Sequence, residues 1–548
     1  MPRTDLALAL FWAGVTALSR VPFRARLLPS WDAVQFALAL RDYDIVKHQP
    51  HPPGYILYVA LARALEPLAG DATESLTWLA LAASAVTVFL VYRLAWMLYG
   101  RATASLAAAG LAASPLFWFY GVVGLSYTTE AALATGIATL AWRMRSGESR
   151  FAAWSAVALG LAGGVRQSVL ILLLPLWVGM AWAGLRRWRP VLSGLAVIAL
   201  TTAAWFGPMV WLTGGFWRYT GAALELFDST VRATTIVGAP GAWQANATAL
   251  LEALVLGLGL LLPVLAGLVV LSLGRVRRWD ARAWFFAGWI VPPLGVYTAV
   301  HFGQHGYLLT VLPALYILIA RGLVVLGRRL GAAWRVAATW LRAAQWATAA
   351  AVLAAILLAH AAFFATAAPI EVPGLFAAAP GSEGWGTALR ARYRFRLWPT
   401  TARGLREQEG VIRAYVDAVR SAFNPANAVV VTELGNPRSY PWFRHVMYYL
   451  PEFTVIHLRL GRFSPGYISS RHDGAMAALG DSEIILAANV RRLVWVVDYW
   501  NPMVPRPAGL RAYPLAYGRW LYVLDVGRHP VEHAGYRLTP LTAVARLR

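Results

Sequence analysis

Polar and charged side chains gather in one segment, Trp31–Tyr58, which reads WDAVQFALALRDYDIVKHQPHPPGYILY and follows the first apolar run of the chain. Asp32 and His51 are the candidates for proton transfer, and Asp42 and Asp44 lie between them. Only 14% of all residues are charged, whereas 59% are hydrophobic, so a dense polar cluster favours a chemical role. We therefore expect the active site in this segment.

Asp32 precedes the amphipathic pattern AVQFALAL, so it would lie at a helix N-terminus. There it could simply interact with the helix dipole, or it could act as a general base at the membrane surface. His51 begins the sequence HPPGY, in which two prolines fix the backbone and Gly54 permits a sharp turn. This histidine is either an ordinary interfacial side chain or a ligand for a phosphate or a substrate hydroxyl.

Two further charged residues stand near the ends of apolar runs. Glu130, in SYTTEAAL, is either a favourable helix-N-terminal carboxylate or part of a substrate path. Arg166, in GGVRQS, suits a lipid phosphate because guanidinium binds phosphate oxygens through two parallel hydrogen bonds. A salt bridge or a contact with a lipid headgroup explains Arg166 equally well.

The segment HFGQHGY adds Gln304, His305 and Tyr307. The spacing of His301 and His305 could in principle bind a metal, but no carboxylate is adjacent, so contacts with a phosphate or a sugar are favoured. The sequence therefore predicts no metal ligands.

The composition indicates a membrane protein with many spans. Apolar runs near the ~20 residues needed to cross a bilayer recur along the chain, and they predict about eleven spans, at 5–19, 74–98, 103–121, 125–142, 152–165, 168–185, 190–213, 247–273, 283–300, 306–326 and 345–367. The net charge of +23 comes almost wholly from arginine, and the arginines lie mostly in short loops beside spans, so no nucleic-acid partner is expected. The chain has no cysteine, which excludes a disulfide framework and a thiolate nucleophile.

The arginine-rich loops predict the orientation. If the N-terminus is cytoplasmic, the loops near Arg101, Arg145, Arg187, Arg278 and Arg329 all face the cytoplasm. This agreement requires that 54–69 be a juxtamembrane or re-entrant helix and not a span. The outer face then receives 20–73, 121–125, 166–167, 214–246 and 301–305, so all the polar candidates converge on one side.

The composition changes at about residue 368, where proline, glycine and charged residues return. Short apolar segments predict buried strands, and helices are expected around 402–422 and 473–490. The strand candidates are NAVVVTEL, FTVIHLRL, RRLVWVVDYW and RWLYVLDVG. We expect a membrane domain over 1–367 and an extracytoplasmic α/β domain over 368–548. In that domain Glu433 follows a strand, where loops often bind ligands, but a simple strand-to-turn junction is favoured.

The order of a first span, an outer loop with Asp32, an amphipathic helix and the motif HPPGYILY at 51–58 resembles the GT-C superfamily of membrane glycosyltransferases. These enzymes use polyprenyl-phosphate sugars. The likeness is strongest to the protein O-mannosyltransferase-like and aminoarabinose-transferase-like branches, with weaker similarity at SYTTEAAL and at 301–323. Asp32 matches the catalytic acidic position in the first loop. Many relatives carry Asp-Glu there, whereas Ala33 follows Asp32, so Asp42 and Asp44 remain alternatives for the base.

The resemblance implies a GT-C-like fold and an inverting hexosyl- or pentosyltransferase in the cell inner (plasma) membrane. The donor would be a polyprenyl-phosphate monosaccharide, and the acceptor a hydroxyl of a lipid, glycan or protein. Asp32 and His51 would be catalytic. Substrate binding would fall to Asp44, Tyr55, Glu130, Arg166, Gln304, His305 and Tyr307. Some relatives use a divalent metal, Mg²⁺ or Mn²⁺, which this sequence does not demand. The alternative is a transporter or lipid-linked sugar flippase with an outer polar vestibule; such proteins usually show internal repeats, and none is found here.

Overall fold

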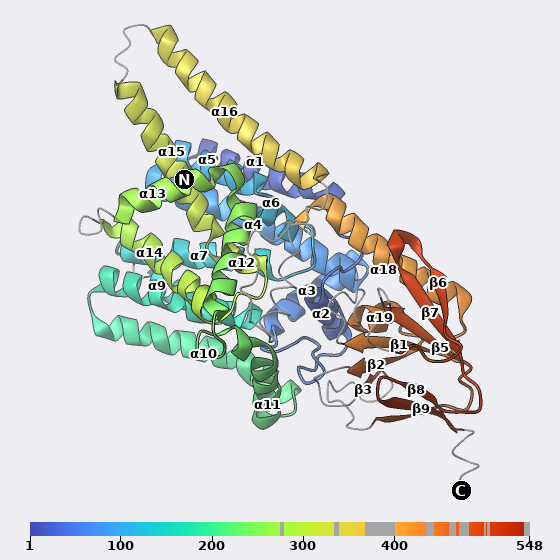
Figure 1. Ribbon diagram of the computed structural model, residues 1–548. Coiled ribbons are helices and arrows are strands. Elements are labelled where there is room, and N and C mark those ends of the chain that lie inside the picture. Colours follow the sequence, from blue (N-terminus) through green and yellow to red (C-terminus); the bar gives the residue numbers. More distant parts are fainter. Residues whose placement is uncertain are drawn as a thin grey trace. The chain divides into compact units, whose positions relative to one another are not determined.

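The structure is a computed structural model of the full chain (Figure 1). It describes residues 1–148, 150–273, 279–333, 339–367, 400–434, 443–459, 467–470, 482–497, 500 and 505–541. The chain divides into two compact units, of which the first holds 1–25 and 52–404 and the second holds 26–51 and 405–548. The predicted domain boundary near 368 lies outside the described residues.

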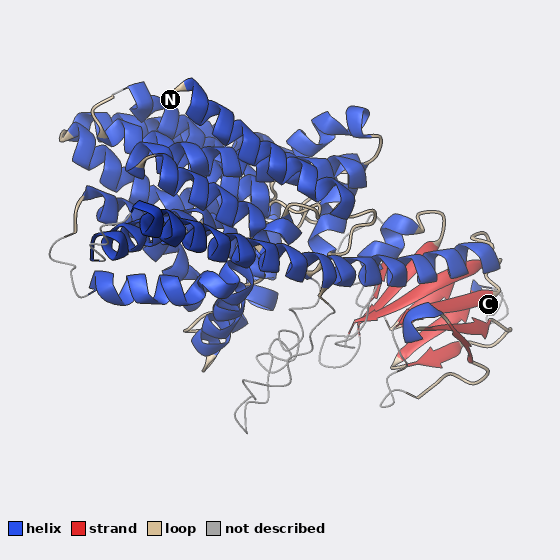
Figure 2. Ribbon diagram, turned by 90° about the horizontal axis from the view of Figure 1, so that it is seen from above, coloured by secondary structure: helices blue, strands red, loops and turns tan. Residues whose placement is uncertain are grey.

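The first unit is built from helices, which lie side by side in both views (Figures 1 and 2). They are α1 (Arg3–Arg20), η1 (Val21–Phe23), α3 (Ile56–Ala69), α4 (Ala72–Tyr99), α5 (Arg101–Ala113), α6 (Pro115–Tyr120), α7 (Tyr127–Arg145), α8 (Arg150–Val165), α9 (Gln167–Leu185), α10 (Trp188–Leu212), α11 (Phe216–Leu226), η2 (Phe227–Val231), η3 (Arg232–Thr234), α12 (Ala242–Leu258), η4 (Gly259–Leu261), α13 (Leu262–Leu273), α14 (Ala281–Ala299), η6 (His305–Thr310), α15 (Leu312–Ala333) and α16 (Thr339–Thr366). Each of the eleven predicted apolar runs falls in these helices.

Several predicted runs are interrupted. The run 103–121 is two helices, α5 and α6, because Pro115 has no N–H to continue the first, and the Ser114 hydroxyl accepts the Phe117 N–H instead. The run 247–273 breaks at Gly259, whose positive φ of 50° favours glycine. Among the described residues, five helices are long and apolar enough to cross a membrane. The total of about eleven spans stays a prediction.

α3 covers the segment predicted to be a juxtamembrane helix. Its 14 residues extend about 21 Å, which is shorter than the ~30 Å hydrocarbon core of a bilayer. α4 is the long central helix of the unit and packs against α1, α5 and α7. Its buried face carries many small residues, including Ala80, Ser84 and Ala95, which allow neighbouring helices to approach closely.

The second unit contains α2 (Trp31–Arg41) and a mixed sheet in the order β3-β2-β1-β5-β7-β6. Strands β1, β2 and β5 are parallel, and the other three pair antiparallel. The strands are β1 (Ala428–Leu434), β2 (Thr454–Arg459), β3 (Tyr467–Ser469), β5 (Arg492–Val497), β6 (Arg511–Pro514) and β7 (Trp520–Asp525). A smaller sheet has the order β4-β9-β8, with β4 (Glu483–Leu486), β8 (Val531–His533) and β9 (Tyr536–Pro540).

The core of this unit follows from the alternation of side chains along β1. Val429 and Val431 point to one face, where they pack with Leu493 and Trp495. The residue between them, Val430, points to the other face. That face is covered by α18 (Ala402–Ala422) from Leu405 onwards, and α19 (Phe443–Tyr449) adds to the same cluster. The predicted helix at 402–422 and the four predicted strands are confirmed.

The predicted helix at 473–490 is wrong over 483–486, which form β4. Ile484 and Leu486 are buried while Glu483 and Ile485 are exposed, which is the two-residue period of a strand. The segment pairs with β9, a contact that a local pattern could not reveal. Residues 471–481 lie outside the described part of the chain.

Candidate functional site

Arg166 occupies the break between α8 and α9. α8 ends at Val165, and Arg166 has an extended backbone (φ −156°, ψ 114°) before α9 begins at Gln167. Gly164, at the end of α8, has no room for a side chain, because a Cβ there would lie 2.6 Å from Leu57 Cγ. The close approach of α3 to α8 therefore depends on this glycine, and the extended residue after it directs the guanidinium into the unit.

Glu130 is the ionic partner of Arg166. It lies in the first turn of α7, and its Oε2 atom is 3.2 Å from Arg166 Nε. The Thr310 hydroxyl donates to Glu130 Oε1 at 2.5 Å, and the Tyr297 hydroxyl lies 2.7 Å from Thr310 Oγ1. Glu130 and Thr310 are fully buried. This network holds the carboxylate in one orientation beside the guanidinium.

The remaining contacts of Arg166 are hydroxyls and aromatic rings. Nη1 donates to Ser126 Oγ at 3.3 Å, and Nε donates to Ser168 Oγ at 3.2 Å. The guanidinium carbon lies 4.6 Å from the ring centres of both Tyr127 and Tyr307. Nη2 has no hydrogen-bond partner within the described ranges. The guanidinium is thus fixed on most sides and keeps one donor nitrogen for a ligand.

The end of the HPPGY motif lies beside Arg166. The Gln167 side chain donates to the Pro53 carbonyl at 3.1 Å, and the Tyr55 ring centre lies 5.8 Å from the Arg166 guanidinium carbon. Tyr55 is the N-cap of α3 and adopts a left-handed backbone (φ 46°, ψ 35°). Two segments singled out in the sequence therefore meet in the first unit.

The 301–307 segment completes the surroundings of Arg166 on one side. Gly306 is required there, because a Cβ would lie 2.4 Å from Tyr127 Cδ2. His305 Nε2 lies 3.3 Å from Glu252 Oε2, whereas His301 Nδ1 lies 2.8 Å from Thr234 Oγ1. Burial is the main cause that lowers the pKa of His301 to about 4, and the positive charge of Arg166 adds to this effect. Near neutral pH His301 is therefore uncharged.

The two histidines contact different partners, so they do not share a ligand. In the part of the chain that the structure describes, no group of three or more His, Asp or Glu side chains is arranged to hold a metal ion. Gln304 is the N-cap residue of η6 and is half-buried.

In the second unit, Asp32 and His51 lie near each other. Ser30 caps α2 by accepting the Ala33 N–H at 3.1 Å, which places Asp32 in the first turn. His51 Nδ1 is 3.8 Å from Asp32 Oδ1 and 2.7 Å from the amide oxygen of Gln35. Since an amide oxygen only accepts, Nδ1 of His51 carries a proton and donates it to Gln35. A carboxylate and an imidazole are therefore held together by α2 and the HPPGY segment.

The other two aspartates of this loop have local partners. Asp42 Oδ2 is 3.0 Å from Lys47 Nζ, and its side chain is 57% exposed against 22% for Asp32. Asp44 Oδ1 accepts the Val46 N–H at 2.9 Å, which stabilises the turn, and Asp44 and Gln49 exchange two backbone hydrogen bonds. Asp42 and Asp44 thus serve the conformation of the loop, whereas Asp32 faces an imidazole.

Glu433, at the carboxyl end of β1, belongs to a separate buried cluster. Its Oε1 atom accepts the Trp495 Nε1–H at 2.9 Å and lies 2.6 Å from His533 Nε2. His533 is fully buried, so the cluster links the two sheets through their side chains. The sequence interpretation of Glu433 as a junction is retained, and residues 435–436, which follow it, lie outside the described part.

The sequence-predicted residues therefore divide between the units. Tyr55, Glu130, Arg166 and Tyr307 gather in the first. His305, two residues before Tyr307, belongs to the same unit and contacts Glu252. Asp32, Asp44 and His51 belong to the second. The expectation that all of them converge on the outer side of the membrane stays a prediction.

Several residues of these clusters were missed in the sequence. Tyr127 precedes Glu130 by three residues, so helical spacing could have placed it on the same side, and Gln35 has the same relation to Asp32. Thr310, Tyr297 and Glu252 come from distant segments, and no local pattern connects them to the charged residues.

Comparison with known proteins agrees with this architecture. No family model and no curated protein matches the sequence. Among solved structures, ArnT from Cupriavidus metallidurans bound to undecaprenyl phosphate is similar, with a TM-score of 0.55 and 13% identity, over 95% of this chain and 98% of that chain. The same protein in the apo state gives a TM-score of 0.53 at 13% identity, over 95% and 97%. The chain thus has the fold of ArnT, and the architecture predicted from its sequence, many apolar helices followed by a C-terminal α/β domain, is confirmed.

Proposed function

We propose that the chain is an integral membrane glycosyltransferase that moves a monosaccharide from a polyprenyl-phosphate donor to an acceptor hydroxyl, with inversion at the anomeric carbon. The shared fold supports this proposal, because the ArnT structure of that fold is bound to undecaprenyl phosphate. The transfer would occur on the extracytoplasmic face of the cell inner membrane, with the N-terminus in the cytoplasm. The acceptor would be a lipid, a glycan or a protein, and the enzyme a hexosyl- or pentosyltransferase.

The surroundings of Arg166 carry the proposal. A buried arginine at a break between two apolar helices is costly in a membrane, so such a residue is usually kept for function. Here the guanidinium is fixed by Glu130 and Ser126, and its Nη2 atom remains available. A lipid phosphate oxygen would accept a hydrogen bond from Nη2. A preorganised cation of this kind stabilises the negative charge that develops on a departing phosphate.

Asp32 is the proposed general base. It would take the proton of the acceptor hydroxyl while the hydroxyl oxygen attacks the anomeric carbon. The bond between that carbon and the phosphate oxygen breaks, and its electron pair leaves with the lipid phosphate. Phosphate is a competent leaving group, so no separate strong acid is required. The hydrogen bond of its Nδ1–H to Gln35 holds the His51 ring in place. From this position the ring would orient the acceptor hydroxyl beside Asp32.

The remaining predicted residues would bind substrate. Tyr55 and Tyr307 offer rings and hydroxyls beside Arg166, and Gln304 and His305 belong to the same outer segment. Glu130 would act by positioning Arg166, because its carboxylate is fully buried against that arginine and Thr310. Asp44 would shape the loop that carries His51.

The test is sugar transfer by the purified full chain from a set of radiolabelled polyprenyl-phosphate monosaccharides. A general base typically contributes 10²–10⁴-fold, so we expect Asp32→Asn to lose activity by about that factor. Asp42→Asn is the matched control, because it makes the same chemical change in the same loop at an exposed position, and its rate should stay within about twofold of the wild type. Equal rates for Asp32→Asn and wild type would remove Asp32 from the mechanism. No transfer with any donor would favour the transport of a lipid-linked sugar.

A further inference from the structure

A cavity of about 410 Å³ lies in the first unit, away from Arg166 along the helices. Residues of α1, α4, α7 and the turn after α7 line it, namely Met1, Leu6, Phe89, Arg93, Trp96, Met97, Arg143 and Glu148. α4 and α7 end near these residues, and α1 begins there. The arginine distribution predicts that this end of the helices is cytoplasmic.

One wall of the cavity is a single face of α4. Phe89, Arg93, Trp96 and Met97 are spaced by three or four residues, so they project from the same side of the helix. Three of these side chains are apolar or aromatic, and Leu6 of α1 adds another apolar surface. Such a wall suits hydrocarbon chains.

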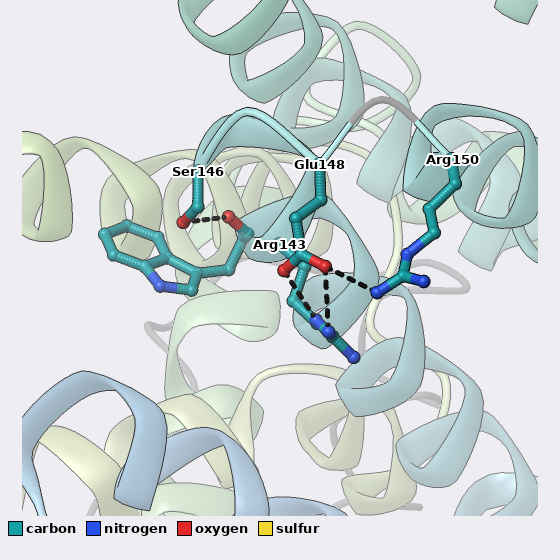
Figure 3. A network of polar contacts seen from close by, with 5 residues as sticks. Arg143, Ser146, Glu148 and Arg150 are labelled. Carbon is teal, nitrogen blue, oxygen red and sulfur yellow. Dashed lines mark hydrogen bonds and ion pairs between the residues drawn. The ribbon is translucent and has the colours of Figure 1, made fainter.

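The polar wall is a fixed network of charges (Figure 3). Arg143 donates to both oxygens of Glu148, at 3.2 and 3.0 Å, and Arg150 donates to Glu148 Oε2 at 2.9 Å. Hydrogen bonds from Arg143 and then Arg150 lower the pKa of the Glu148 carboxyl, which therefore stays ionised. The Arg143 guanidinium also lies 3.9 Å from the centre of the Phe151 ring. One carboxylate is thus shared by two arginines, and a positive charge is left over.

Arg93 adds a second uncompensated charge. It is half-buried, and in the described part of the chain it makes no hydrogen bond or ion pair. A cation beside an apolar wall at the membrane surface is well suited to bind an anionic lipid, because the headgroup can pair with the cation while the acyl chains cover the wall. Basic pockets between spanning helices on the cytoplasmic side have this property.

We propose that the cavity binds the headgroup of an anionic phospholipid of the cytoplasmic leaflet. The lipid phosphate would accept hydrogen bonds from Arg93, the positive charge at Arg143 would attract it, and the acyl chains would lie along Phe89 and Leu6. The bound lipid would bridge α1 and α4. This site is independent of the proposed glycosyl transfer.

The experiment measures lipid binding by native mass spectrometry of the purified full chain in detergent. The probes are 1-palmitoyl-2-oleoyl phosphatidylglycerol and the phosphatidylcholine with the same acyl chains. We expect the wild-type chain to bind its first phosphatidylglycerol molecule more tightly than its first phosphatidylcholine molecule. One basic side chain at an anionic lipid contributes about fivefold in affinity, so Arg93→Gln should weaken that first binding by about this factor.

Arg189→Gln is the matched control, because Arg189 is an exposed arginine predicted on the same membrane side but does not line the cavity. It should bind as wild type does. Arg93→Lys keeps the charge and should retain most of the affinity, which separates loss of binding from loss of folding if Arg93→Gln is unstable. Equal affinity of wild type and Arg93→Gln for phosphatidylglycerol, or equal affinity of wild type for both lipids, would overturn the proposal.

Discussion

Arg166 and Glu130 form an ion pair in which both side chains are buried, with Arg166 Nε 3.2 Å from Glu130 Oε2. The pair joins the break between α8 and α9 to the first turn of α7. Because each charge is neutralised by the other, the arginine can be kept in a dry environment before any substrate arrives. Replacing either residue alone therefore leaves the charge of the other buried and uncompensated.

The ion pair predicts a double-mutant relationship in stability. Glu130→Gln leaves the Arg166 charge buried without its counter-ion, which typically costs about 3–5 kcal/mol. Arg166→Gln should destabilise the chain similarly, because it leaves Glu130 uncompensated. The double variant Glu130→Gln/Arg166→Gln should lose much less than the sum of the two, since residues in direct contact are not additive. Thermal unfolding of the purified chain in detergent checks this, and strict additivity would contradict a direct pairing.

Arg166→Lys separates charge from geometry. Lysine keeps the positive charge but lacks the planar fork that contacts Glu130 and Ser126 and that, in the proposed complex, also reaches a phosphate. We expect a rise in the KM for the polyprenyl-phosphate donor of roughly tenfold or more, as for the loss of one charged hydrogen bond. The KM for the acceptor should change little. An unchanged donor KM would show that Arg166 has only a structural role.

Gly306 offers a steric test of the aromatic contacts of Arg166. In Gly306→Ala, the new Cβ would lie 2.4 Å from Tyr127 Cδ2, so the ring must shift from its present position, 4.6 Å from the guanidinium carbon. We expect reduced transfer, with a rise in donor KM. Gly295→Ala is the control, because a Cβ at that position meets nothing within 4 Å, and its activity should match wild type. Equal effects of the two alanines would argue against a role for the Tyr127 position.

The fold was largely predictable because its signals are local. Runs such as 74–98 and 168–185 are apolar over the length of a membrane span, and helices α4 and α9 follow them within two residues. The short strands of the second unit gave weaker signals. β6 has four residues, all exposed, so no alternation of buried and exposed side chains marks it. β4 was assigned to a helix because its pairing with β9 depends on distant residues.

The site was predictable only in part. Arg166 stood out because it breaks the arginine distribution, and the HPPGY motif stood out through its prolines and glycine. Their proximity in the first unit, through Gln167 and Pro53, required the structure. The sequence also left Asp32, Asp42 and Asp44 equivalent in type. The family resemblance favoured Asp32, and the contacts separate the three further, because Asp42 pairs with Lys47 and Asp44 stabilises a turn.

The predicted orientation can be tested with single cysteines, since the chain has none of its own. Val237, in a segment predicted to be outside, is 92% exposed, and Arg187, in a loop predicted to be cytoplasmic, is also exposed. In cells whose outer envelope is permeabilised while the inner membrane stays sealed, a membrane-impermeant maleimide should label Val237→Cys and not Arg187→Cys. After detergent lysis both should react. The reverse pattern before lysis would place the Arg166 end of the helices in the cytoplasm.

His48 makes the stability of the second unit depend on pH. Burial is the main cause that lowers its pKa from 6.5 to about 3, and the charges of His51 and Arg444 add to it. Above pH 6.5 the histidine is neutral in both the folded and the unfolded chain, so it contributes no pH dependence. Below pH 6.5 the unfolded chain binds a proton that the folded chain does not. The free energy of unfolding should therefore fall by about 1.4 kcal/mol per pH unit until the pH reaches about 3.

Between pH 7 and pH 5 this effect amounts to about 2 kcal/mol, measurable by denaturant unfolding of the full chain. His48→Asn should flatten the dependence by about that amount, because asparagine does not titrate and tolerates the left-handed backbone of this position (φ 54°). His529→Gln is the control, since His529 is exposed, and it should follow the wild-type curve. If the curves of wild type and His48→Asn coincide from pH 7 to pH 5, His48 does not stay neutral in the folded protein.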